Sequence, residues 1–96
     1  MTYESLKKFG TKVDEKDYYN NGIYSFTREF WVCQSGLYVH EQHPNTNHYS
    51  GQTTTYQAVD LEDLEKINAM YVQAHIGLSE KGLERARACA EKQKPD

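Results

Sequence analysis

The chain of 96 residues lacks a basic excess, a long apolar run and an N-terminal apolar leader, and each absence excludes a class of protein. It carries 11 Lys and Arg against 14 Asp and Glu, which gives a net charge of −3. A free-standing nucleic-acid-binding domain usually has a basic excess, because phosphate contacts supply most of its affinity. The apolar runs are too short for a membrane span, and no stretch resembles a signal peptide. We therefore expect a soluble, cytoplasmic protein with no membrane partner.

Cysteine and proline are also scarce, with two residues of each. Cys33 and Cys89 form no metal-binding knuckle, and without a secretory signal both are expected to be reduced. There is no internal repeat and no linker-like stretch. A chain of this length forms one domain, spanning residues 1–96, which buries roughly two thirds of the surface that the unfolded chain exposes.

Charge is zoned along the chain. Residues 18–59 carry only three charged side chains, yet they hold six tyrosines, two phenylalanines and the only tryptophan. Linkers are polar and poor in aromatic residues, so this neutral zone is predicted to form the sheet of the fold. The residues on either side of it are rich in charge and carry helical patterns.

Three helices are predicted from spacing and capping residues. Thr2 caps a short N-terminal helix in "TYESLKKFG", which Gly10 ends. Asp60 caps a second helix that Gly77 stops, and Ser79 caps a third. Apolar residues recur at helical intervals on the last two helices. These stripes predict that both helices pack on one face of the sheet.

Alternating side chains predict the strands. Asn21-Gly22 is a strong hairpin-turn signal, and it precedes the alternating run "IYSFTREFWVCQ". The stretches "LYVHEQH" and "QTTTYQAV" are further strands. If Ser35-Gly36 closes a two-residue turn, Val32 faces Val39 and Trp31 faces His40. The core face then gathers six residues: Tyr24, Phe26, Phe30, Val32, Leu37 and Val39.

The fold class predicted is α+β: a short N-terminal helix, an antiparallel sheet of three or four strands, and two C-terminal helices packed on one face. Its second sheet face would carry large aromatic residues. Such residues are costly in solvent unless something covers them, so two interpretations stay open. Either the N-terminal helix or residues 11–19 pack there, or a partner protein does.

The composition of the neutral zone favours a protein or glycan partner over a phosphate backbone. Tyrosine supplies rigid contact area, and Asn, Thr, Ser, Gly and Gln supply adaptable hydrogen bonds, as in antibody combining sites. The predicted contact residues lie on the open face or nearby. They are Trp31, Tyr38, His40, Glu29, Tyr49 and Tyr56.

The helix after Asp60 has apolar residues over more than half of its circumference, more than a helix packed only on a sheet requires. It is predicted either to lie wedged between the sheet and the last helix or to form a homodimer seam. The seam residues would be Asn68, Val72, His75 and Ile76.

The histidine-rich stretch "HEQHPNTNHY" suggests a metal or catalytic site, but its geometry argues against both. His40 and His43 are three residues apart, so in a continuous strand they point to opposite faces, and their spacing with His48 matches no standard zinc pattern. Cys33 and His40 could form a nucleophile and base, but no orienting third residue or oxyanion loop is evident. No cofactor, metal or catalytic residue is therefore predicted.

The sequence thus predicts a small, non-catalytic protein-binding module of the kind found among inhibitors, immunity proteins and phage or mobile-element accessory (anti-defence) proteins. It would act by covering a surface of another protein. Two alternatives stay open. One is a nucleic-acid-binding module that uses Arg28, the sheet aromatics and the basic side of the last helix. The other is a metal-binding or enzymatic domain at His40, His43 and His48.

Overall fold

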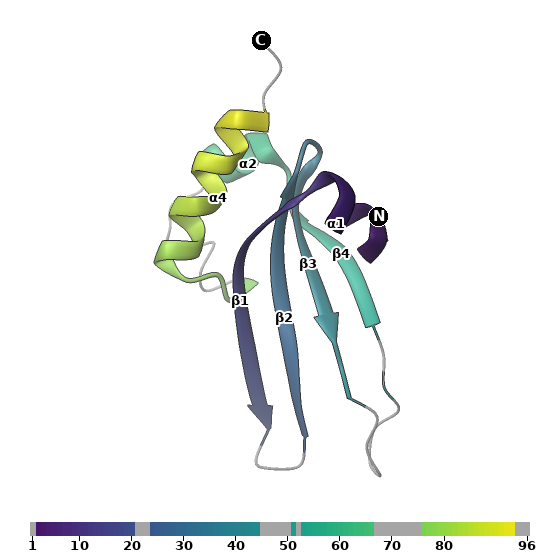
Figure 1. The fold of residues 1–96 in the computed structure, drawn as a ribbon. Helices are drawn as coiled ribbons and strands as arrows, with labels where there is room; N and C mark the ends of the chain where they lie inside the picture. Colours follow the sequence, from purple (N-terminus) through teal and green to yellow (C-terminus); the bar gives the residue numbers. More distant parts are fainter. Residues whose placement is uncertain (1, 21–23, 45–50, 52, 67–75, 94–96) are drawn as a thin grey trace.

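The computed structural model describes residues 2–20, 24–44, 51, 53–66 and 76–93. It has the α+β architecture predicted from the sequence, with one four-stranded antiparallel sheet in the order β1-β2-β3-β4 (Figure 1). The elements follow in chain order as α1 (Tyr3–Phe9), β1 (Thr11–Asn20), β2 (Tyr24–Cys33), β3 (Gly36–Gln42), β4 (Thr53–Val59), α2 (Leu61–Lys66) and α4 (Glu80–Gln93).

The β2–β3 hairpin confirms the predicted faces but corrects the predicted register. Trp31 pairs with Tyr38 and Val32 pairs with Leu37, so Gln34 and Ser35 form the turn in place of Ser35 and Gly36. The pairing of one strand is shifted by two residues from the prediction. Because side chains alternate with a period of two, an even shift leaves every residue on its predicted face.

Two clusters of buried side chains lie on opposite faces of the sheet. The main core joins the face of Phe30, Val32 and Val39 to apolar residues from α2, α4 and the segment before α4. The smaller cluster joins Leu6 of α1 to residues on the other face. The buried members of the main core are Val13, Phe30, Val32, Leu37, Val39, Leu64, Ile76, Leu78, Leu83, Ala86 and Ala90. The side chain of Tyr24, which was predicted to join this core, lies outside the described residues.

Helix α1 forms as predicted and covers the second face. The Thr2 hydroxyl accepts a hydrogen bond from the Ser5 amide at 3.2 Å, which caps the first turn. At the other end the Gly10 amide donates to the Leu6 carbonyl. A Cβ at Gly10 would lie 2.8 Å from Cys33 Sγ, so the close approach of this turn to β2 explains the glycine.

Helix α4 is capped as predicted and is tied to β1. The Ser79 hydroxyl accepts from the Gly82 amide at 3.0 Å and donates to Asp14 Oδ2 at 2.9 Å. Farther along α4, Arg85 donates to the Val13 carbonyl at 3.1 Å. The helix therefore lies along the outer part of the sheet next to β1, as Figure 1 shows.

Strand β1 was the element that the sequence did not reveal in full, because charged residues interrupt any simple alternation from Lys12 to Asp17. It pairs with β2 from Thr11 to Asn20, with an irregularity between Lys12 and Asp14. The predicted Asn21-Gly22 turn lies outside the described residues, although the strands that it would join are paired.

The predicted second helix is described over Leu61–Lys66. Asp60 precedes it, and the backbone carbonyl of Asp60 accepts a hydrogen bond from the Leu64 amide. Of the predicted dimer seam, Asn68, Val72 and His75 lie outside the described residues. Ile76 is buried in the main core of its own chain, so its expected position at a seam between two chains is corrected.

The described helices gather at the end of the sheet that holds the β2–β3 turn. The opposite end of the four strands projects beyond them (Figure 1). The long axis of the molecule measures 50 Å against 16 Å for the short one. No described helix covers these strand ends (Figure 1). We refer to them below as the open end of the sheet, formed by residues 17–19, 25–27, 42–44 and 53.

Candidate functional site

The face predicted to be open is covered in this structure. Trp31 and Tyr38 are only 9% and 8% exposed, and both pack against Leu6 of α1. Glu29 and His40 on the same face are buried as well. The expectation that these four residues face solvent is therefore wrong, and the alternative that the N-terminal helix packs there is confirmed. Alternating strand patterns show which residues share a face, but they do not show what covers it.

His40 is a buried, neutral imidazole. Its ring stacks on Tyr3 with centroids 3.7 Å apart and planes 5° apart, and Nδ1 lies 2.6 Å from the Thr55 hydroxyl. Nε2 has no hydrogen-bond partner among the described residues. Burial lowers the pKa of His40, and the charge of Lys7 adds to this, while the charge of Glu29 offsets it in part. His40 therefore contributes an uncharged ring on the sheet against which Tyr3 of α1 packs.

Glu29 is the charged member of the same buried group. Trp31 Nε1 donates to its Oε1 at 3.3 Å, and Lys12 Nζ lies 3.6 Å from its Oε2. The pKa of the Tyr3 phenol is raised by burial and by its hydrogen bond and proximity to Glu29. The polar atoms beneath α1 mostly bond to one another, so these side chains hold the helix in place.

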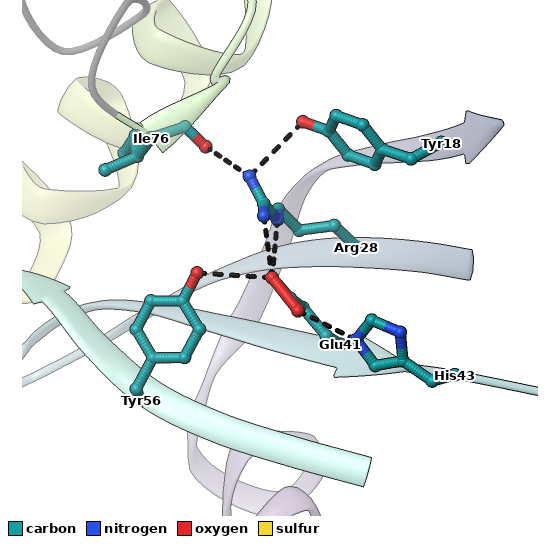
Figure 2. A network of polar contacts seen from close by, with 6 residues as sticks. All are labelled: Tyr18, Arg28, Glu41, His43, Tyr56 and Ile76. Carbon is teal, nitrogen blue, oxygen red and sulfur yellow. Dashed lines mark hydrogen bonds and ion pairs between the residues drawn. The ribbon is translucent and has the colours of Figure 1, made fainter. Parts of the chain in front are cut away.

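A second polar group lies on the main-core face, beyond the apolar residues. Figure 2 shows Arg28 of β2 at its centre, between Tyr18 of β1 and Glu41 of β3. Arg28 Nε and Nη2 donate to Glu41 Oε1 at 3.0 and 2.7 Å. Arg28 Nη1 donates to the Ile76 carbonyl at 3.0 Å and lies 3.4 Å from the Tyr18 hydroxyl. One guanidinium therefore joins three elements of the fold.

The carboxylate of Glu41 also contacts the other two side chains of this network, His43 and Tyr56. His43 Nε2 lies 2.9 Å from its Oε2, and the Tyr56 hydroxyl donates to its Oε1 at 3.4 Å (Figure 2). Burial alone would raise the pKa of Glu41, but the hydrogen bonds and charges of His43 and Arg28 together lower it. Burial alone would lower the pKa of Arg28, but its hydrogen bonds to Glu41 and its electrostatic interactions with Tyr56, Tyr18 and Glu41 together raise it.

A nucleic-acid-binding sheet would use Arg28 to contact phosphate, but this network already binds the side chain of Arg28 within the protein. Its donors face Glu41, Ile76 and Tyr18, and its Cζ atom lies 4.7 Å from the centre of the Tyr18 ring. A phosphate would have to displace the carboxylate of Glu41. We therefore interpret Arg28 and Glu41 as a polar clamp that closes the main core where the helices end.

The histidines and the cysteine considered as an alternative metal or catalytic site lie apart from one another or bind other side chains. His40 lies under α1, His43 contacts Glu41 and stacks on Phe26 with ring centroids 4.3 Å apart, and His48 lies outside the described residues. In the described part of the chain no group of three or more His, Cys, Asp and Glu side chains could hold a metal ion. Burial raises the pKa of the Cys33 thiol, and proximity to Cys89 adds to this, which favours the unreactive thiol over the thiolate.

The open end of the sheet carries a different chemistry. A shallow hollow of about 490 Å³ lies there and is lined by Ser25, Phe26, Thr27, Gln42, His43, Pro44 and Thr53. Its lining has no Asp, Glu, Lys or Arg side chain. Tyr19 is the cross-strand partner of Ser25 and is 80% exposed, the highest value among the large hydrophobic side chains described.

Of the six predicted contact residues, only Tyr56 is placed on the surface, at 41% exposure, and Tyr49 lies outside the described residues. Sequence reasoning missed Tyr19, because strand β1 was not extended through it. The Asn21-Gly22 signal that follows Tyr19 could have placed it opposite Ser25, near the end of a hairpin.

A scan against protein-family models, a search of curated proteins and a search of solved structures each found no match to the chain. None of the described helices has the length and apolar character needed to cross a membrane. The candidate site therefore stands on the geometry of the open end alone.

Proposed function

We propose that the protein is a non-catalytic binding module that covers a surface of another protein, as inhibitors and immunity proteins do, and that it binds with the open end of its sheet. One observation carries the proposal. Tyr19 stands almost fully exposed beside an uncharged hollow, on strands that project beyond the described helices. A large tyrosine side chain in this position exposes apolar area that a partner could bury.

The chemistry of the hollow supports a protein partner. Hydroxyl and amide groups from Ser25, Thr27, Gln42 and Thr53 lie next to the rings of Phe26 and His43. The hollow itself is lined by no full charge, and the nearest described carboxylate, that of Asp17, accepts a hydrogen bond from Thr27 at its rim. A partner that enters the hollow therefore avoids the cost of burying a charged side chain of the lining. An aromatic anchor surrounded by neutral polar groups is the usual composition of a protein-recognition surface.

Side-chain contacts between the strands at this end also support the proposal. The clamp of Arg28 and Glu41 and the stacking of Phe26 on His43 and Tyr18 hold three strands together immediately beside the hollow. Binding to a rigid surface loses less conformational entropy than binding to one that must first become ordered.

A capture experiment tests the proposal. The tagged protein is incubated with a lysate of its source cells, and bound proteins are identified by mass spectrometry with and without nuclease. Tyr19→Ala should remove the captured partner, and so should Thr53→Arg, which places a charge in the hollow. Both positions are exposed, so both variants should stay folded.

Two matched controls belong to this experiment. Phe9→Ala removes an exposed aromatic ring of α1, and Thr11→Arg adds the same charge near the start of β1, both far from the hollow. Both should retain the partner. The proposal fails if Tyr19→Ala and Thr53→Arg bind as well as the controls, or if nuclease alone abolishes capture.

A further inference from the structure

The two edges of the sheet differ in how they are protected against pairing with another strand. An edge strand exposes unpaired backbone N–H and C=O groups, and natural proteins protect such edges with charges, irregularities or a covering element. Strands β1 and β4 are the two edges here. The comparison between them is independent of the proposed function.

Strand β1 has all three kinds of protection. It carries five charged side chains, namely Lys12, Asp14, Glu15, Lys16 and Asp17. Its register is interrupted between Lys12 and Asp14. Helix α4 also lies against it, since Arg85 donates to the Val13 carbonyl and Ser79 binds Asp14. A strand from another chain would meet charge, an irregular backbone and a helix.

In the part of the chain that the structure describes, strand β4 has neither charged side chains nor a covering helix, and its register irregularity lies only at its end. Its seven residues, Thr53–Val59, include no charged side chain, and no described strand pairs with its outer edge. Thr53, Thr54, Tyr56 and Gln57 are exposed. The register irregularity on this strand falls between the partners of Leu37 and Tyr38, near its end, and leaves Thr53 to Gln57 regular.

We propose that β4 pairs with β4 of a second copy of this chain, so that two four-stranded sheets join into one. The uncharged edge is what selects a second copy. A symmetric pair brings each residue of the strand against the same strand, and like charges facing each other would oppose it. Two copies of Thr53–Val59 can pair without that repulsion, whereas the charged side chains of β1 would oppose the pairing of two β1 strands.

The symmetry fixes which residues meet. A two-fold axis perpendicular to the sheet makes the two β4 strands antiparallel and keeps both core faces on the same side. Residues of the same face must then lie opposite each other. With the axis at the middle of the seven-residue strand, Tyr56 lies opposite its own copy, and Thr54 lies opposite Ala58. Tyr56 lies on the core face, because its partner Val39 does.

Analytical ultracentrifugation tests this pairing, with protein concentrations up to about 1 mM to include weak dimers. Wild type should show a reversible species of twice the 11.2 kDa chain mass. The double variant Thr54→Lys/Tyr56→Lys places lysines opposite one another in the central register and in those shifted by two or four residues toward Thr53. It should raise the dimer dissociation constant at least about tenfold.

A charge-matched control is Phe9→Lys/Gln34→Lys, which adds two lysines at exposed positions away from β4. It should dimerise like wild type. Circular dichroism shows whether the edge variant is folded. If that variant unfolds, hydrogen exchange of the wild-type protein tests the pairing instead. The amides of β4 should gain protection as the protein concentration rises, and those of β1 should not. A wild-type monomer over the full range, a control that loses the dimer equally, or protection that is independent of concentration overturns the proposal.

Discussion

Arg28 and Glu41 face each other across β2 and β3, and two nitrogens of the guanidinium donate to the same carboxylate oxygen, at 3.0 and 2.7 Å. The pair is partly buried, with side-chain exposures of 20% and 14%. It lies where the apolar core ends and the open end of the sheet begins. The geometry of the proposed binding surface therefore depends on this pair.

Arg28→Ala should destabilise the protein by about 1–3 kcal/mol, because it leaves the partly buried Glu41 carboxylate and the Ile76 carbonyl without their main donor. Urea denaturation measures the change. As a control, Lys66→Ala removes an exposed ion pair with Glu62 and should leave the midpoint unchanged, since solvent already screens that pair. Equal effects of the two substitutions would show that the clamp has no special role.

Trp31→Ala should destabilise the fold by about 3 kcal/mol or more, because it removes a large side chain from the cluster beneath α1. Tyr19→Ala should have almost no effect on stability, since that ring is 80% exposed. Denaturation followed by circular dichroism compares them. A folded Trp31→Ala protein of normal stability would mean that α1 does not cover this face in solution.

Stability should fall as the pH drops below the unperturbed histidine value, because His40 has a lowered pKa in the folded protein. Between its folded and unfolded pKa values the unfolded chain binds a proton that the native protein does not, so acid favours unfolding. Neutral His40 makes its full contribution to the free energy of unfolding above about pH 6.5, and this contribution is lost as the pH falls below that value through the lowered pKa of the folded protein. Guanidinium denaturation at a series of pH values should show this dependence in wild type. His40→Asn, which keeps a polar group near Thr55 but does not titrate, should show a shallower one, and an identical profile would contradict the assignment.

Gly82→Ala should destabilise the protein, although the same change stabilises an ordinary helix interior. A Cβ at residue 82 would lie 2.8 Å from both Cβ and Cγ of Asp14, the residue to which Ser79 of the α4 cap is bonded. We expect a loss of about 1–3 kcal/mol from this overpacking. Lys81→Ala, at the neighbouring exposed position, serves as the control in thermal unfolding. Stabilisation by Gly82→Ala would show that α4 does not approach β1 this closely.

The fold class, the two sheet faces and the helix caps could be predicted because they rest on local chemistry. Thr2 and Ser79 are cap residues wherever a helix follows, and Phe30 and Val32 share a face at any even register. Strand β1 could not be delimited in the same way. Its charged residues are held by tertiary partners, such as Ser79 for Asp14, that lie far away in sequence.

The position of the site was harder to predict for the same reason. Whether Trp31 is covered depends on how Gly10 turns the chain back over β2, which no periodicity encodes. The clamp joins Arg28 to Glu41 and to the Ile76 carbonyl, 13 and 48 positions away. The exposure of Tyr19 likewise follows from where the helices end.

Hydrogen exchange of the protein bound to its captured partner is the most direct test of the central claim. Binding through the open end should slow amide exchange in residues 17–19, 25–27, 42–43 and 53 and leave α4 and the β2–β3 turn unchanged. Protection confined to α1 or α4, with no change at the strand ends around Tyr19, would contradict the account.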